Sequence, residues 1–215
     1  MLTSRHSDIQ FVGEEGAQSL PPGGRFWLVD PLCGTANYAA DLPLFATNVA
    51  LVEDGLVTAA VVADVMRREI YVAERGRGAW RSDGQRLQAS AVSQLVSVDP
   101  FLGSNSHPLG EFSRRFAVRA ITQARFGVRI FASTLVLAYV ATGRLAAAVF
   151  CNTPVPVHVA AGLLLAEEAG AIVTDDVGAP WRLTSPLVVI AASRELHQEL
   201  LRSARETLNE SGQQA

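Results

Sequence analysis

The chain contains no lysine, because every one of its 18 basic residues is an arginine. Lysine-dependent phosphate loops and Schiff-base enzymes need that amine, so the sequence excludes both classes. The basic residues are outnumbered by 21 acidic residues, which leaves a net charge of −3. This balance excludes the strongly basic surface that is typical of nucleic-acid-binding proteins.

Long apolar runs and cysteines are also scarce. The N-terminus, MLTSRHSDIQ, has no apolar signal segment, and the longest apolar stretch, residues 135–150, is interrupted by Gly143 and Arg144. We therefore expect a cytoplasmic protein with no membrane partner. The two cysteines, Cys33 and Cys151, could form one disulfide, but in that compartment we expect both to be reduced.

The first half of the chain has the composition of a sheet. Of its 215 residues the chain has 49% apolar ones, enough to bury a sizeable core. Segments rich in Val, Ala, Ile and aromatic residues predict strands at 26–30, 46–55, 56–66 and 69–74, with a small hairpin at 80–88. Because the connections are short, we expect these strands to be antiparallel neighbours.

The second half alternates between helical and strand patterns. Helices are predicted at 107–118, 133–143, 158–170 and 194–209, and strands at 96–100, 125–131, 144–150, 171–174 and 186–193. The pattern predicts an α/β protein. We expect a mainly antiparallel lobe at 1–95 and a mixed α/β lobe at 96–215, packed together as one compact fold.

Three segments could converge on a site. They are Gly13-Glu14-Glu15 after the apolar stretch IQFV, the motif DPLCGT at 30–35, and PVPVHVAAG at 154–162, where a helix is predicted to begin at His158. Strand ends and helix N-termini gather ligands in α/β folds, because the first N–H groups of a helix have no intrahelical partner.

These motifs, in this order, resemble those of the inositol monophosphatase family, which are magnesium-dependent, lithium-sensitive phosphomonoesterases. The family pattern is G-E-E, then D-P-[IL]-D-G-T-x-N, then W-D-x-A-A-G, and LPLFATNVALVEDG, VAERGRGAW, LAYVATGR and LLLAEEAGAIVTD agree further. The resemblance implies the family's layered α/β sandwich, Mg²⁺ as cofactor, a small phosphorylated metabolite as substrate and a homodimer.

The resemblance also assigns roles to individual residues. Matching positions place the first magnesium on Glu14, Asp30 and the carbonyl of Leu32. The N–H groups of Gly34 and Thr35 would face the phosphate. The Thr35 hydroxyl and Glu14 would together orient the attacking water.

The second magnesium position departs from the family pattern. Its ligands in the family are Asp30 and two further acids, and those two acids are Cys33 and His158 in this chain. The tryptophan of the last motif is Val157, and the family's sugar-contacting glutamate falls at Cys151. Cys33 and Cys151 would therefore stand in the substrate site beside Gly34 and Thr35.

Two further departures concern architecture. A family Gly-Ser becomes Phe131-Ala132, which puts a ring where substrate would need space, although Phe131 also fits a core position. The resemblance begins with SDIQFVGEE, so the family's N-terminal helices have no counterpart. Either that helical layer is missing or the true start lies upstream. A missing layer would expose apolar sheet surface, so we expect a homodimer, another homo-oligomer or a partner over that face.

Two interpretations of the altered site remain open. In the first, the chain is a divergent phosphatase with impaired or lost catalysis, a pseudoenzyme with at most one weak Mg²⁺ site. In the second, it is an active phosphatase with zinc or manganese at Asp30, Cys33 and His158, and Cys151 as a possible fourth ligand. Thiolate and imidazole favour zinc over magnesium. We expect His158, at a helix N-terminus, to be neutral.

The remaining polar residues are expected to be solvated. His6, His107 and His197 show no ligand spacing, Glu167 and Glu168 precede a helix end, and the arginines at 67–68 and 75–77 lie in turns.

Overall fold

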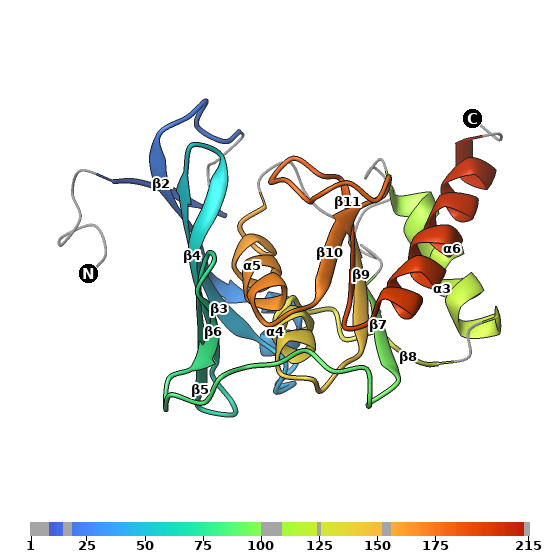
Figure 1. Ribbon diagram of the computed structural model, residues 1–215, viewed down its shortest axis with the longest axis horizontal. Helices are drawn as coiled ribbons and strands as arrows, with labels where there is room; N and C mark the ends of the chain where they lie inside the picture. Colours follow the sequence, from blue (N-terminus) through green and yellow to red (C-terminus); the bar gives the residue numbers. More distant parts are fainter. Residues whose placement is uncertain (1–8, 15–18, 100–108, 124–125, 152–155, 213–215) are drawn as a thin grey trace.

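The computed structural model describes residues 9–14, 19–99, 109–123, 126–151 and 156–212. Within these residues the chain forms two mixed sheets and five helices. The sheets have six and five strands. Figure 1 shows a layered arrangement, with helices between the two sheets and further helices on the outer face of the five-stranded sheet. The predicted α/β class is confirmed.

The first sheet follows chain order. Its strands are β1 (Gln10–Gly13), β2 (Arg25–Cys33), β3 (Ala46–Glu53), β4 (Leu56–Asp64), β5 (Glu69–Glu74) and β6 (Gly78–Arg81). Only β1 and β2 pair in parallel, so the predicted antiparallel neighbours are confirmed for the other pairs. Asp54 and Gly55 join β3 to β4 with positive φ values of 49° and 80°, as a two-residue type I′ turn requires.

The second sheet has the order β10-β11-β9-β7-β8. Its strands are β7 (Leu95–Asp99), β8 (Gly127–Arg129), β9 (Ala147–Cys151), β10 (Ile172–Asp175) and β11 (Leu187–Ala191). Strand β7 runs parallel to β8 and β9, whereas β11 runs antiparallel to β9 and β10. Helices α3 (Gly110–Gln123) and α6 (Arg194–Gly212) cover the outer face of this sheet (Figure 1).

Helices α4 (Leu135–Ala141) and α5 (Ala160–Glu168) lie between the two sheets (Figure 1). Their side chains are buried nearly all round, which explains why the sequence of α5 is apolar on every face. A Cβ atom at Gly162 would lie 2.6 Å from Leu137 Cβ, so this glycine lets the two helices approach closely. The core around α4 and α5 draws residues from both sides of position 95, and the division into two lobes stays a prediction.

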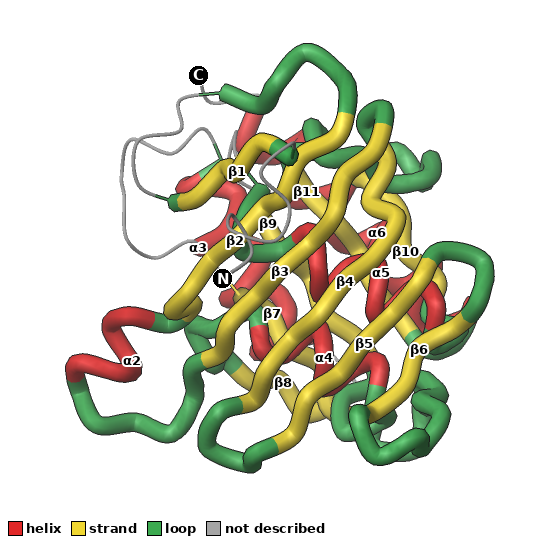
Figure 2. Tube along the Cα trace, turned by 90° about the vertical axis from the view of Figure 1, so that its left-hand side faces the viewer, coloured by secondary structure: helices red, strands yellow, loops and turns green. Residues whose placement is uncertain are grey.

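The outer face of the first sheet has no helix over it among the residues that the structure describes, and Figure 2 looks directly onto it. Phe11, Val61 and Ile70 are 45%, 36% and 44% exposed there. The absence of a first helical layer stays a prediction.

Three further expectations are settled by burial and contacts. Both cysteines are reduced, as predicted. His197 is wrongly predicted as solvated, because it is buried and bonds Thr174 Oγ1 through Nε2 at 2.9 Å. His6 and His107 lie outside the described residues. None of the described helices is long and apolar enough to cross a bilayer.

The end of α5 is also not the free surface that we expected. Glu168 accepts the backbone N–H groups of Gly76 and Gly78 at 2.7 and 2.8 Å. Glu167 accepts a hydrogen bond from Trp181 Nε1 and pairs with Arg75 at 3.3 Å. The two carboxylates therefore fix the β5–β6 turn to the helix, a long-range contact with no local sequence signal.

Candidate functional site: the Asp30, Cys33 and His158 cluster

A bulge in β2 brings Asp30 and Cys33 to the same side of the sheet. The strand was predicted to end at Asp30 but continues to Cys33. Asp30 pairs with Asn48 and Cys33 with Ala46, so β2 holds one more residue than β3 between these pairs. Residues three apart on a regular strand point to opposite faces, and the extra residue corrects this. Asp30 is 0% and Cys33 6% exposed.

The Asp30 carboxylate is engaged through both oxygens. Oδ1 accepts the backbone N–H of Leu32 at 3.1 Å, which stabilises the bulge. Oδ2 lies 2.8 Å from Nδ1 of His158. His158 precedes α5, which begins at Ala160 rather than at His158 as predicted. Its side chain is 27% exposed, so the ring joins the buried acid to the surface.

The charge of His158 differs from our expectation. Burial alone would lower the pKa of its imidazole, but the hydrogen bonds to Asp30 and Cys33 and their charges raise the pKa to about 10. The prediction of a neutral ring is therefore wrong. The reason is that a fully buried carboxylate in direct contact outweighs the dipole of a nine-residue helix that begins two residues later.

Cys33 is held by two polar residues that the sequence did not single out. Its Sγ lies 2.7 Å from Oγ1 of Thr134, the residue before α4. Asn48 Nδ2 donates to the same Oγ1 at 3.2 Å. The hydrogen of the Thr134 hydroxyl is then available for the sulfur. Oδ1 of Asn48 is buried and has no hydrogen-bond partner within the part of the chain that the structure describes.

The three residues form a cluster with the composition of a metal site. One ligand atom from each of Asp30, Cys33 and His158 lies within 4.8 Å of the other two. No other group of three such residues is found in the described ranges. The structure thus brings together three predicted residues of the family's second metal position. Asp30 is the ligand that this chain retains, and Cys33 and His158 replace the other two acids.

The other predicted site residues lie around this cluster or away from it. Glu14 follows β1, whose register with β2 places it near the level of Asp30, but its side chain is exposed and outside the cluster. Thr35 is the exposed first residue of the short helix α2 (Thr35–Ala39). Cys151 is buried elsewhere, with Sγ 3.0 Å from Ser113 Oγ on α3, so the structure does not provide it as a fourth ligand.

The loop after Cys33 has its own constraints. Gly34 has φ of 90°, and a Cβ atom there would lie 2.8 Å from the carbonyl oxygen of Leu44. Asn37 Nδ2 donates to the carbonyls of Leu44, Phe131 and Ala132 at 2.9, 3.0 and 3.2 Å. Phe131 is partly buried and packs against the core, in agreement with its interpretation as a core residue. These contacts fix the loop that carries the N–H groups of Gly34 and Thr35.

The cluster does not fit the second magnesium ion of the family. Magnesium prefers oxygen ligands in an octahedron, whereas Cys33 offers sulfur and His158 offers nitrogen. The only carboxylate in the cluster, Asp30, already bonds Leu32 and His158.

Comparisons with known proteins agree with the motifs. Residues 2–209 match the sequence profile of the inositol monophosphatase family. The inositol-1-monophosphatase of Caulobacter vibrioides is 31% identical over 213 residues, covering 95% of this chain and 81% of its own. That of Mesorhizobium japonicum is 34% identical over 201 residues, covering 91% and 73%.

A solved structure gives the same result in three dimensions. The Thermotoga maritima IMPase superposes with a TM-score of 0.82 at 29% identity, covering 97% of this chain and 79% of that one. The matched motifs, the layered sheets and these likenesses lead to one conclusion: the chain belongs to the inositol monophosphatase family.

Proposed function

We propose that the chain is a divergent inositol monophosphatase-like protein whose magnesium-dependent hydrolysis of small phosphorylated metabolites is impaired or lost. The observation that carries this proposal is the pairing of Asp30 with His158 at 2.8 Å, beside Cys33. In the family these positions hold carboxylates for the second ion. Here Asp30 is retained, but the other two positions hold the imidazole of His158 and the thiol of Cys33.

The loss of the second ion's carboxylate ligands matters because of the charge that develops in the reaction. In a two-metal site the ions stabilise both the attacking and the leaving oxygen, which is worth several kcal/mol. The imidazolium of His158 cannot replace an ion, because its charge is already paired with the buried Asp30. Each 1.4 kcal/mol corresponds to about tenfold in rate, so we expect a rate lower by orders of magnitude.

Part of the machinery is retained in this proposal. Gly34 and Thr35 would bind the phosphate through their N–H groups, and Glu14 and the Thr35 hydroxyl would orient water. At most one weak magnesium site would remain, on Glu14, Asp30 and the Leu32 carbonyl. The exposed positions of Glu14 and Thr35 are compatible with these roles.

The direct test is hydrolysis of inositol 1-phosphate with Mg²⁺. We expect the native chain to be slower than the Caulobacter vibrioides relative by about a hundredfold or more. The double variant Cys33→Asp/His158→Asp should gain activity if the rest of the site is intact. Robust turnover by the native chain would contradict the proposal. The single variants serve as controls, because each restores only one carboxylate.

A second candidate is an active phosphatase with altered metal preference. It is favoured by the proximity of one ligand atom each from Asp30, Cys33 and His158, which together suit zinc better than magnesium. Turnover by metal-free protein after addition of Zn²⁺ or Mn²⁺, and its absence with Mg²⁺, would select this candidate over the first.

We also propose that the outer face of the first sheet is covered in the cell by a second copy of the chain or by another partner. The support is the exposure of Phe11, Val61 and Ile70 on that face. Light scattering at micromolar concentration tests it, and a monodisperse monomer that binds no hydrophobic dye would contradict it. A cytoplasmic location stays a prediction.

A further inference from the structure

We propose that Asp30, Cys33 and His158 form a binding site for one thiophilic divalent cation of the zinc class. This inference goes beyond the proposed function, because it requires no turnover and holds for an inactive chain. It follows from the mismatch between the cluster and the family's second magnesium ion, because a set of donor atoms that does not suit magnesium can suit zinc.

The donor atoms have the right chemistry. Zinc is bound in proteins by cysteine sulfur, histidine nitrogen and carboxylate oxygen, and the cluster offers one of each. The only other cysteine of the chain, Cys151, bonds Ser113 and takes no part. Among the described residues the site therefore has three protein ligands, which leaves a fourth position for water or a ligand oxygen, as in open zinc sites.

The spacing needs only a small adjustment. Zinc–ligand bonds of about 2.0–2.3 Å in a tetrahedron place the donor atoms about 3.4–3.6 Å apart. His158 Nδ1 and Asp30 Oδ2 are 2.8 Å apart, and one donor atom from each of the three residues lies within 4.8 Å of the other two. In the metal-free protein a proton joins the acid to the ring. A cation would take the place of that proton, with shifts below about 1 Å.

The sulfur is positioned by the surrounding residues. The β2 bulge turns Cys33 toward Asp30, and the Thr134 hydroxyl lies 2.7 Å from Sγ. Asn48 orients that hydroxyl by donating to it, and its own Oδ1 is left buried without a partner within the described residues. A polar layer of this kind, behind the ligands, is what fixes ligand orientation in metal sites.

The cation also has a route to the site. Asp30 and Cys33 are buried, but the His158 side chain is 27% exposed and forms the outer side of the cluster. Solvent can therefore reach the ring that would carry one of the metal–ligand bonds.

The experiment is a titration of metal-free, full-length protein with Co²⁺, which replaces zinc and reports its ligands by absorption. We expect a sulfur-to-cobalt charge-transfer band and visible bands of a tetrahedral ion, both removed by Zn²⁺. The variant Cys33→Ser should lose the charge-transfer band. Cys151→Ser is the matched control, since it removes the other buried thiol and should keep the band.

A second pair of variants tests the polar layer. Thr134→Val should weaken zinc binding in calorimetry by roughly 10- to 100-fold, the usual effect of losing a residue that orients a ligand. Thr134→Ser keeps the hydroxyl and should bind zinc with an affinity close to that of the native chain. Zinc should also raise the melting temperature of the native chain and of Cys151→Ser, because it binds the folded state.

The inference is overturned if the native chain shows no charge-transfer band, or if Cys33→Ser and native protein give the same zinc isotherm. If Cys33→Ser does not fold, His158→Gln takes its place, and unchanged zinc affinity in that variant overturns the inference as well. Because no substrate is present, failure here is distinct from failure of the proposed loss of magnesium-dependent activity.

Discussion

Two buried carboxylate clusters lie on the first sheet, and their partners differ. Around Asp30 the partners are one imidazole, one backbone N–H group and a neighbouring sulfur. The second cluster lies between β4, β5 and the end of α4. It contains two acids, two tyrosines and three arginines, namely Asp64, Glu69, Tyr71, Tyr139, Arg67, Arg81 and Arg144.

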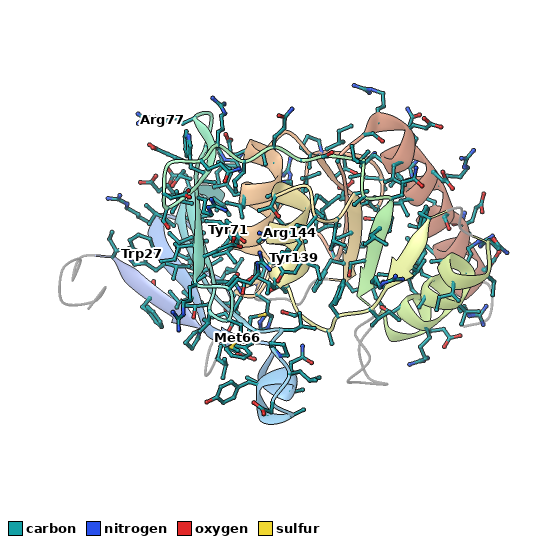
Figure 3. All side chains as sticks on the ribbon, turned by 90° about the horizontal axis from the view of Figure 1, so that it is seen from below. Trp27, Met66, Tyr71, Arg77, Tyr139 and Arg144 are labelled. Atoms are coloured by element: carbon teal, nitrogen blue, oxygen red, sulfur yellow. The ribbon has the colours of Figure 1, made fainter. Side chains whose placement is uncertain are left out.

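The second cluster is fully paired. Arg144, Tyr71 and Tyr139 lie next to one another in Figure 3. Arg144 donates to Tyr71 and Glu69 at 2.6 and 2.8 Å and lies 5.4 Å from the Tyr139 ring centroid. Tyr139 in turn donates to the buried Asp64 at 2.9 Å. Rigid donors of this kind hold an acid in one place, which is typical of a structural network.

The first cluster, in contrast, consists of groups that ligate metals. Next to it, Oδ1 of Asn48 accepts no hydrogen bond from the residues that the structure describes. The comparison teaches that burial of an acid does not by itself indicate function. What distinguishes the two clusters is whether the partners satisfy one another or remain able to accept a further ligand.

The largest effect should come from breaking the structural cluster. Arg144→Met removes one of three arginines that bond Glu69, together with its hydrogen bond to Tyr71. Since hydrogen bonds to charged groups contribute about 1.5–3 kcal/mol, we expect a loss of about 3 kcal/mol of unfolding free energy. Arg77→Met is the matched control, because Arg77 is 71% exposed and its pair with Glu74 should contribute less than about 1 kcal/mol. Urea denaturation of both variants measures the difference, and equal losses would show that the cluster is not structural.

Acid should weaken the same cluster. Burial would raise the pKa of Glu69, but hydrogen bonds from Tyr71, Arg67 and Arg144 lower it from 4.5 to about 2. Because the folded-state pKa lies below the unfolded value, the stabilisation is complete above about pH 4.5 and is lost as the pH falls toward 2. The loss can reach about 3 kcal/mol. Glu69→Gln should reduce the slope of stability against pH in this window, and an unchanged slope would contradict the assignment.

The metal-free Asp30 cluster should respond at the opposite end of the pH scale. The pKa of His158 is raised from 6.5 to about 10, so its stabilisation is complete below pH 6.5 and is lost as the pH rises toward 10. At pH 6 we expect His158→Gln to cost about 1–3 kcal/mol, since Asp30 loses a charged partner. Denaturation of chelator-treated protein at pH 6 and 9.5 checks this, and the gap between native and variant should narrow at the higher pH.

Much of the fold could be predicted from local pattern. Strand β5 has the predicted bounds of 69–74. The short connections between the strands of the first sheet correctly predicted that neighbours such as β4 and β5 are antiparallel. The bulge in β2 could not be predicted, because it depends on the pairing of Asp30 with Asn48 and of Cys33 with Ala46 across two strands.

The site was only partly predictable for the same reason. The family motifs identified Asp30, Cys33 and His158, which the fold brings together. No sequence pattern indicated the roles of Asn48 and Thr134, since these residues are 86 positions apart and lie in segments predicted only as a strand and a helix. The charge of His158 was predicted wrongly, because it is set by a contact 128 positions away and not by the adjacent helix.

The smallest expected effect on stability comes from variants that change a single atom, and it should differ between the two clusters. Cys33→Ser replaces sulfur by oxygen, and the new hydroxyl can still bond Thr134, so we expect less than about 1 kcal/mol of stability change in metal-free protein. Tyr71→Phe also changes one atom but removes a hydroxyl that donates to Glu69 and accepts from Arg144. Hydrogen bonds to charged groups contribute about 1.5–3 kcal/mol, so this loss should be larger.

The two variants together sharpen the comparison. A cluster kept for structure should be sensitive to the smallest change, whereas a cluster kept for a ligand should tolerate it until the ligand is added. Adding zinc should therefore widen the stability gap between native protein and Cys33→Ser and leave the gap for Tyr71→Phe unchanged. If zinc leaves both gaps unchanged, the Asp30 cluster holds no cation. Its three residues are then a second structural cluster, with weaker partners than the one around Arg144.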